Sequence, residues 1–143
     1  MTVDALMSRD VVTVSPDTVL MDIRKMLHER GFHHLLVVEG DALAGIISDR
    51  DVLRELSPFL DTPSESARDV RSLGRPAAEI MHANPMTVAP DTPAPDAATR
   101  LLKHSVSALP VVDDGALVGI VTTRDLLRYY AGADQDTSVS VDG

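Results

Sequence analysis

The chain has 143 residues, of which 44% are hydrophobic, and a formal net charge of −9, so it is large enough to bury one shared core. The acidic charge argues against general nucleic-acid binding, because phosphate neutralisation needs clustered lysine and arginine. Cysteine is absent, which excludes disulfides, thiolate catalysis and cysteine-bound zinc. Since no stretch has the length and apolar character of a membrane span, and the first residues do not resemble a signal peptide, we expect a soluble cytoplasmic protein without a membrane partner.

One sequence pattern occurs twice in the chain without a gap. Residues 7–53 align with residues 81–127 at a constant offset of 74. The identical pairs include Met7/Met81, Thr13/Thr87, Val14/Val88, Pro16/Pro90, Asp17/Asp91, Thr18/Thr92, Leu27/Leu101, Gly45/Gly119, Arg50/Arg124 and Asp51/Asp125. Two copies predict two equivalent halves related by a pseudo-twofold axis.

The first copy predicts the element order strand, helix, strand, strand, helix. A short strand at 11–14 precedes a Pro-Asp turn, and apolar residues at helical spacing follow over 19–27. The runs 35–38 and 43–47, separated by Glu39-Gly40-Asp41, predict a hairpin. The polar tetrad Ser48-Asp49-Arg50-Asp51 then opens another helix.

The second copy predicts the same elements. They are a strand at 86–89, a helix whose first turn contains Pro93 and Pro95, a hairpin from 109–112 and 117–121, and a helix opened by residues 122–125. Between the copies lies a Pro-, Ser- and Glu-containing linker in which we expect a short helix near 64–73. The predicted boundaries are repeat 1 at 1–56, linker at 57–78, repeat 2 at 79–131 and a mobile tail at 132–143.

Both copies carry a glycine-apolar-apolar-Ser/Thr-x-x-Asp motif. The two segments are Gly45-Ile46-Ile47-Ser48-Asp49-Arg50-Asp51 and Gly119-Ile120-Val121-Thr122-Thr123-Arg124-Asp125. They resemble the signature of cystathionine-β-synthase (CBS) domains, and Ala108 to Asp113 resembles the strand that precedes the family's hairpin. The resemblance implies an α/β (α+β) fold in which two β-α-β-β-α repeats form one tandem pair, or Bateman module.

The resemblance also implies a ligand, because the cleft of such pairs commonly binds AMP, ADP, ATP or S-adenosylmethionine. Carboxylates accept hydrogen bonds from ribose hydroxyls, helix N-termini favour phosphate, and arginine supplies a fork-shaped cation. The candidate binding residues are the aspartates Asp51 and Asp125, the hydroxyls Ser48 and Thr122, the cations Arg50 and Arg124, and His33, Ser107, Leu109 and Pro110 near the adenine or phosphate.

A second interpretation of the two tetrads stays open. Ser48-x-x-Asp51 and Thr122-x-x-Asp125 also have the pattern of a helix capping box, and capping and binding are compatible. The second copy is closer to the family pattern, so Asp125 is the safer ligand residue. His33 and His34 would point to opposite faces of a strand, and the remaining histidines lack metal-ligand spacing, so no metal site is expected.

We therefore expect a regulatory module that senses an adenine nucleotide and signals to a partner protein. The acidic surface favours AMP or ADP, and magnesium would only accompany ATP. The alternative is an assembly module with a vestigial cleft, and a homodimer is expected in either case. No catalytic residues and no obligatory cofactor are expected, because the chain lacks the nucleophile elbow, the Walker loop, the Rossmann fingerprint and the metalloprotease helix.

Overall fold

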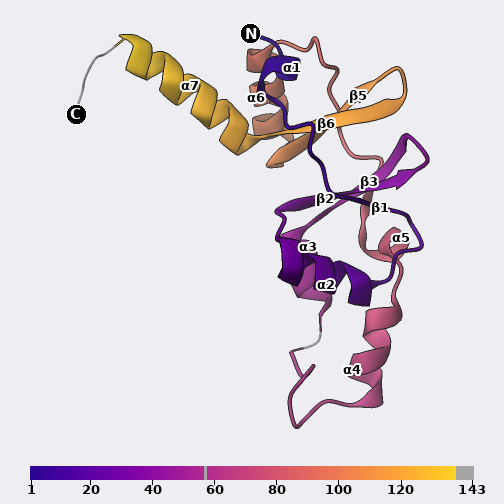
Figure 1. The fold of residues 1–143 in the computed structure, drawn as a ribbon. Coiled ribbons are helices and arrows are strands. Elements are labelled where there is room, and N and C mark those ends of the chain that lie inside the picture. Colours follow the sequence, from indigo (N-terminus) through magenta and orange to yellow (C-terminus); the bar gives the residue numbers. More distant parts are fainter. Residues whose placement is uncertain (57, 138–143) are drawn as a thin grey trace. The chain divides into compact units, whose positions relative to one another are not determined.

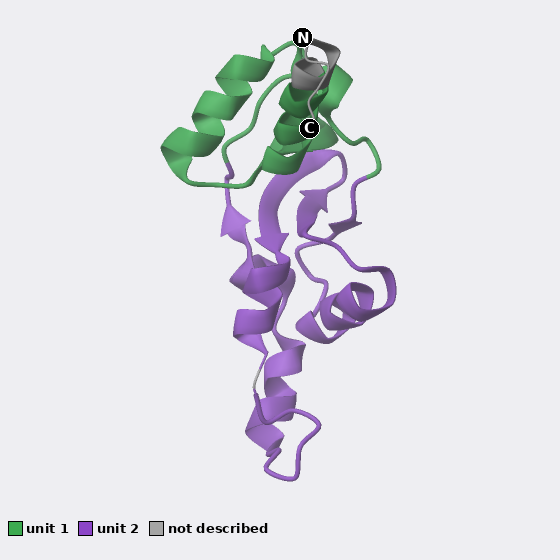
Figure 2. Ribbon diagram, turned by 90° about the vertical axis from the view of Figure 1, so that its left-hand side faces the viewer, with its two compact units in different colours: residues 1–10, 86–143 green, residues 11–85 purple. Residues whose placement is uncertain are grey.

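The computed structural model describes residues 1–56 and 58–137, which form two compact units. Unit 1 comprises residues 1–10 and 86–143, and unit 2 comprises residues 11–85 (Figure 2). The units do not coincide with the predicted repeat boundaries, because residues 1–10 belong with the second repeat, whereas the linker and residues 79–85 belong with the first.

Unit 2 is built on a four-stranded sheet of order β1-β2-β3-β4 (Figure 1). Strand β1 is parallel to β2, and β3 is antiparallel to both of its neighbours. The elements of this unit are β1 (Thr13–Val14), α2 (Leu20–Arg30), β2 (His34–Glu39), β3 (Ala42–Ser48), α3 (Asp49–Glu55), α4 (Ala67–Arg71), the 3₁₀ helix η1 (Ser72–Gly74), α5 (Ala77–Ile80) and β4 (His82–Ala83).

The core of unit 2 explains why these segments take their local structure. Helix α2 buries Leu20 and Ile23 at helical spacing, while β2 buries Leu35 and Val37 at the alternate spacing of a strand. The same core takes up Ile47, Val52, Ala77 and Ile80 from β3, α3 and α5. Helix α5 therefore packs in the core of the first repeat, although it spans the predicted boundary between the linker and the second repeat.

Unit 1 repeats this plan with shorter edges. Its elements are α1 (Val3–Leu6), α6 (Ala94–His104), β5 (Ala108–Asp113), β6 (Ala116–Thr122) and α7 (Thr123–Thr137). The hairpin of β5 and β6 is flanked by two isolated bridges, a parallel one between Val88 and Val111 and an antiparallel one between Ser8 and Ile120. Through the 74-residue offset, Val88 corresponds to a residue of β1 and Ser8 to a residue of β4. Both units therefore have the same strand order.

Each unit thus contains a short segment, here called its arm, that packs on the other repeat. The arm of unit 1 is residues 1–10, which include α1, and the arm of unit 2 is α5 and β4. In unit 1 the Val3 N–H donates to the Thr92 carbonyl at 2.9 Å, and the Ala77 N–H donates to the Thr18 carbonyl at 2.7 Å in unit 2. Val3 and Ala77 are equivalent by the offset, and both are fully buried. The exchange is therefore reciprocal and uses the same contacts twice.

A methionine of each arm packs on the signature glycine of the hairpin. A Cβ atom on Gly119 would lie 2.7 Å from the Ser8 carbonyl oxygen and 2.9 Å from Met7 Sδ. A Cβ atom on Gly45 would lie 2.9 Å from the His82 carbonyl oxygen and 2.5 Å from Met81 Sδ. Only glycine lets the arm approach this closely, which gives a structural reason for the glycine in both motifs.

The predicted hairpins and the helices after each turn are confirmed, whereas the strand expected at 11–14 is limited to Thr13–Val14 and three further segments differ from the expectation. The strand expected at 86–89 is reduced to the Val88 bridge, because Pro110, the equivalent of Leu36, has no N–H to donate to residue 86 as Leu36 donates to the Val12 carbonyl. The linker helix is shorter than expected and is followed by η1. Helix α7 continues to Thr137, so the tail expected from residue 132 is helical up to that point. The rest of that predicted tail, 138–143, lies outside the described residues.

Candidate functional site

The first predicted binding tetrad forms the start of helix α3. The Ser48 N–H donates to Asp51 Oδ2 at 2.8 Å, and the Asp51 N–H donates to Ser48 Oγ at 3.1 Å. This reciprocal pair is a capping box, which satisfies two of the backbone donors that every helix start leaves open. The sequence-based alternative of a capping box is therefore confirmed for this tetrad.

The second tetrad starts helix α7 in the same way. The Thr122 N–H donates to Asp125 Oδ2 at 2.8 Å, and the Asp125 N–H donates to Thr122 Oγ1 at 3.2 Å. Thr122 Oγ1 also lies 3.1 Å from Asp125 Oδ2. Capping thus occupies the Oδ2 atom of each aspartate, and the other oxygen, Oδ1, decides what else the carboxylate can bind.

The Oδ1 atoms of the two aspartates have different surroundings. In unit 2, Asp51 Oδ1 lies 3.2 Å from His82 Nε2 and 3.2 Å from Arg54 Nη1. In unit 1, Asp125 Oδ1 lies 3.4 Å from Arg128 Nη1, a weaker contact with the residue equivalent to Arg54. The side chain of Asp51 is 6% exposed and that of Asp125 is 13% exposed, so the second carboxylate is the more accessible one.

The surroundings of Asp51 change its proton affinity. Burial acts to raise the pKa of the Asp51 carboxyl, but hydrogen bonds from Ser48 and His82 favour the charged form and hold that pKa below its usual value. The carboxylate is therefore ionised at neutral pH. An ionised carboxylate is acceptor-only, as a ribose anchor has to be.

The structure places the predicted histidines beside the same helix start. His33 Nδ1 lies 3.3 Å from Asp49 Oδ2, and the His33 carbonyl accepts the Asp49 N–H at 3.0 Å. Burial lowers the pKa of His34, while the charge of Asp49 acts in the opposite direction. His33 is exposed and lies just before β2, whereas His34 is half-buried and is the first residue of that strand.

The remaining predicted residues divide into exposed and buried ones. Arg50 and Arg124 are exposed in the first turns of their helices, where a cation is available to an anion from solvent. Ser107 is exposed, and its carbonyl accepts the Thr123 N–H at 2.9 Å, as His33 does for Asp49. Leu109 and Pro110 are fully buried, and Leu109 belongs to the core of unit 1, so packing already uses its side chain.

Sequence reasoning missed the second-oxygen partners of the two aspartates. Arg54 and Arg128 stand three residues after Asp51 and Asp125, a spacing that brings side chains together on a helix and that the repeat shows twice. In the sequence, His82 is one of the histidines that lack metal-ligand spacing, and nothing around it indicates a partner. Its contact with Asp51 joins residues 31 positions apart and depends on the pairing of β4 with β3, which no local pattern reveals.

Two further features of the described residues bear on function. Within the described part of the chain, no three His, Asp or Glu side chains are arranged to hold a metal ion. None of the helices in residues 1–56 and 58–137 combines the length and apolar character needed to cross a bilayer.

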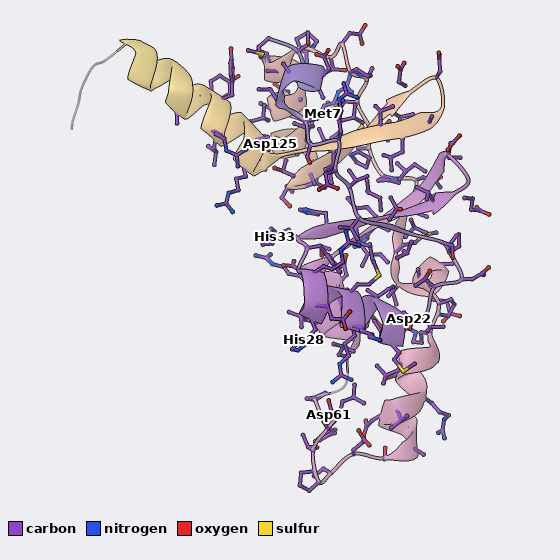
Figure 3. The ribbon with its side chains drawn as sticks, in the orientation of Figure 1. Met7, Asp22, His28, His33, Asp61 and Asp125 are labelled. Atoms are coloured by element: carbon purple, nitrogen blue, oxygen red, sulfur yellow. The ribbon has the colours of Figure 1, made fainter. Side chains whose placement is uncertain are left out.

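Unit 2 also carries an open groove of about 890 Å³, lined by residues of α2, of α3 and of the segment that follows α3. Figure 3 labels Asp22 and His28 on α2 and Asp61 on that segment, and Arg24, which also lines the groove, forms an ion pair with Asp61. None of the predicted ligand residues lines it.

Comparison with known proteins identifies the repeat. The family model of the CBS domain matches residues 3–58 and 77–132. A CBS domain-containing protein of Dictyostelium discoideum is 39% identical over 128 residues, which are 87% of this chain and 88% of that protein. The chain spans only 23% of the inosine-5'-monophosphate dehydrogenase of Korarchaeum cryptofilum, to which it is 32% identical over 124 residues.

Solved structures share the fold over nearly the whole chain. The structure of CBSX2 in complex with AMP is 30% identical, with a TM-score of 0.76 and coverage of 93% of this chain and 98% of that one. A CBS domain pair in complex with 5'-methylthioadenosine and S-adenosyl-L-methionine is 28% identical, with the same TM-score of 0.76 and the same coverage of 93% and 98%. The doubled signature, the matching arms and these likenesses agree that the chain belongs to the CBS domain family and contains a tandem pair, a Bateman module.

Proposed function

We propose that this CBS domain pair is a regulatory module that binds an adenosine-containing nucleotide, of the AMP or ADP type, and signals its occupancy to a partner protein. The observation that carries the proposal is the divided carboxylate of Asp125. One oxygen completes the capping box, and the other has a single contact, at 3.4 Å, among the described residues. Such an oxygen can accept hydrogen bonds from ribose hydroxyls without any loss of the helix cap.

The groups around Asp125 suit the rest of a nucleotide. Thr122 and Arg124 stand at the N-terminus of α7, where the helix dipole attracts phosphate. Arg124 is exposed and offers a guanidinium that pairs with phosphate through two parallel hydrogen bonds. The AMP in the CBSX2 complex and the adenosine derivatives in the other CBS pair support a ligand of this class.

In unit 2 we assign the same roles to Asp51, Ser48 and Arg50, with His33 near the phosphate. The main chain near His33 and Ser107 would contact the adenine edge in the two units. Leu109 and Pro110 would shape the second site from within the core rather than by direct contact, because both are fully buried.

The assembly function is the second candidate, and two observations favour it. Both aspartates already have a structural task as caps, and Leu53 and Leu127, equivalent by the repeat, are 62% and 64% exposed on α3 and α7. Exposed leucines at matching positions suit a contact between copies, so we propose a homodimer under either function.

A thermal-shift experiment separates the two functions. AMP at one hundred times its dissociation constant should stabilise the protein by about 2.7 kcal/mol. Asp125→Ala should remove most of this shift, and 2'-deoxy-AMP, which lacks one ribose hydroxyl, should give a smaller shift than AMP on the unsubstituted chain.

The matched control is Asp69→Ala. Asp69 forms a capping box with Ser66 at the start of α4, with the Ser66 N–H 2.8 Å from Asp69 Oδ2, but it lies outside both repeats. Each Asp→Ala change should cost about 0.5–2 kcal/mol as a lost cap. If AMP and S-adenosylmethionine give no shift on any variant, the aspartates are caps only and the assembly function stands.

A further inference from the structure

The two aspartates differ in how many acceptor positions they have left. A carboxylate oxygen has two lone pairs, and Asp51 Oδ1 is already approached by His82 Nε2 and Arg54 Nη1, each at 3.2 Å. Asp51 Oδ2 accepts the Ser48 N–H of the cap. A ribose hydroxyl that binds Asp51 Oδ1 would therefore have to displace one of these donors.

The repeat itself shows which donor is the added one. Arg54 has its counterpart in Arg128, which approaches Asp125 Oδ1 at 3.4 Å. His82 corresponds to Ser8 at the offset of 74. The strand register is the same in both units, since His82 of β4 pairs with Ile46 of β3 and Ser8 bridges Ile120 of β6. Among the described residues, the imidazole on the second oxygen is thus a feature of unit 2 alone.

His82 is also placed where it can leave. Its side chain is 66% exposed, and β4, which carries it, is a two-residue edge strand. The contact with Asp51 is therefore only partly buried, and it is weakened because solvent reaches the imidazole and the side chain loses freedom to hold it.

We propose that His82 is a latch on the unit 2 site: its imidazole occupies Asp51 Oδ1 in the free protein and has to turn away before a ribose binds. This inference rests on the proposed function, in which Asp51 is a ribose anchor. Its consequence is an order of filling, since the Asp125 site has no such latch and binds first.

The latch should be stronger at acidic pH, because an imidazolium holds a carboxylate more firmly than a neutral imidazole does. The other charged groups near Asp51 are Arg54 and Asp49 on α3 and His34 on β2, and His33 is paired with Asp49. Since two other histidines lie close, the pH dependence of interest is the part that a change of His82 removes.

The test uses adenosine as the probe, because it carries the ribose and has no phosphate that titrates in the same range. Calorimetric titration of an Asp125→Asn variant reports the Asp51 site, once with His82 and once with His82→Ser, which copies the residue of unit 1. We expect His82→Ser to tighten adenosine binding about two- to fivefold near pH 5.5 and by less near pH 8. Thermal unfolding of each variant verifies that it is folded.

The reciprocal exchange is the matched control. Ser8→His in an Asp51→Asn background places an imidazole at the equivalent register position beside the Asp125 site and should weaken adenosine binding there near pH 5.5. Equal affinity with and without the His82→Ser change at both pH values would overturn the latch while leaving the proposed function intact. Weaker binding in His82→Ser would also overturn it, because the histidine would then be a ligand contact. Absence of adenosine and AMP binding at both sites would overturn the proposed function and the latch together.

Discussion

Asp51 is a buried carboxylate, and the hydrogen bonds that it accepts keep it in the charged form despite its burial. Its side chain is 6% exposed, yet Ser48, His82 and Arg54 all donate to it. Removing one of these donors leaves the others in place, whereas removing the carboxylate leaves all three without their acceptor and reduces the capping box to the bond from the Asp51 N–H to Ser48 Oγ. Removing the Asp51 carboxylate is thus expected to destabilise the fold more than removing any one of its donors.

The depressed pKa of Asp51 makes stability depend on acid. Because the folded-state pKa lies below the unfolded value, the stabilisation is complete above about pH 4 and is lost as the pH falls through the folded-state pKa. We expect the difference in unfolding free energy between the unsubstituted chain and Asp51→Asn to shrink below about pH 4 in urea titrations. A difference that stays constant from neutral pH into acid would contradict the assignment.

At the scale of the elements, each signature glycine is required because an arm packs directly on it. The Ser8 carbonyl would lie 2.7 Å from a Cβ at position 119, and the His82 carbonyl 2.9 Å from one at position 45. Backbone atoms of a paired strand do not yield as a flexible side chain does. A side chain in place of either glycine would therefore displace the arm that packs on it.

Gly45→Ala and Gly119→Ala should each destabilise the fold by about 1–3 kcal/mol, because the added methyl pushes the arm off the hairpin. Gly74→Ala is the control, since nothing lies within 4 Å of a Cβ there and its φ is not positive. Chemical denaturation of the three variants compares them. A loss at Gly74 equal to that at Gly119 would show that the close approach of the arm does not set the cost.

Local patterns predicted the hairpins and the long helices, since strand alternation, Asp-Gly turns and helical spacing each arise from neighbouring residues. They also identified Asp51 and Asp125 together with the cap that each forms. They did not predict the place of α1 or α5, because these four-residue helices are stabilised by packing on a distant repeat. Gly132 and the acidic residues after it favoured a tail, but α7 continues through Gly132, whose cost in a helix is only about 1 kcal/mol.

For the whole molecule, the matched exposed leucines predict how copies associate. Leu53→Glu together with Leu127→Glu should weaken the proposed homodimer about tenfold or more, because each charge would have to be buried beside apolar surface. Analytical ultracentrifugation over a range of concentrations measures the change. Val70→Glu, which alters an exposed apolar residue on α4, should leave the mass unchanged. A monomeric mass for the unsubstituted chain would contradict the homodimer.

The crossed arms give the two units different histories during synthesis. Unit 2 is complete once residue 85 has left the ribosome, because its arm, α5 and β4, follows its hairpin in the chain. The arm of unit 1, residues 1–10, precedes unit 2 in the chain, whereas the hairpin of β5 and β6 on which it packs follows unit 2. The apolar side chains of Val3 and Met7 therefore lack their core while unit 2 is synthesised, so unit 1 folds after unit 2 and is the half in which a nascent chain most needs protection.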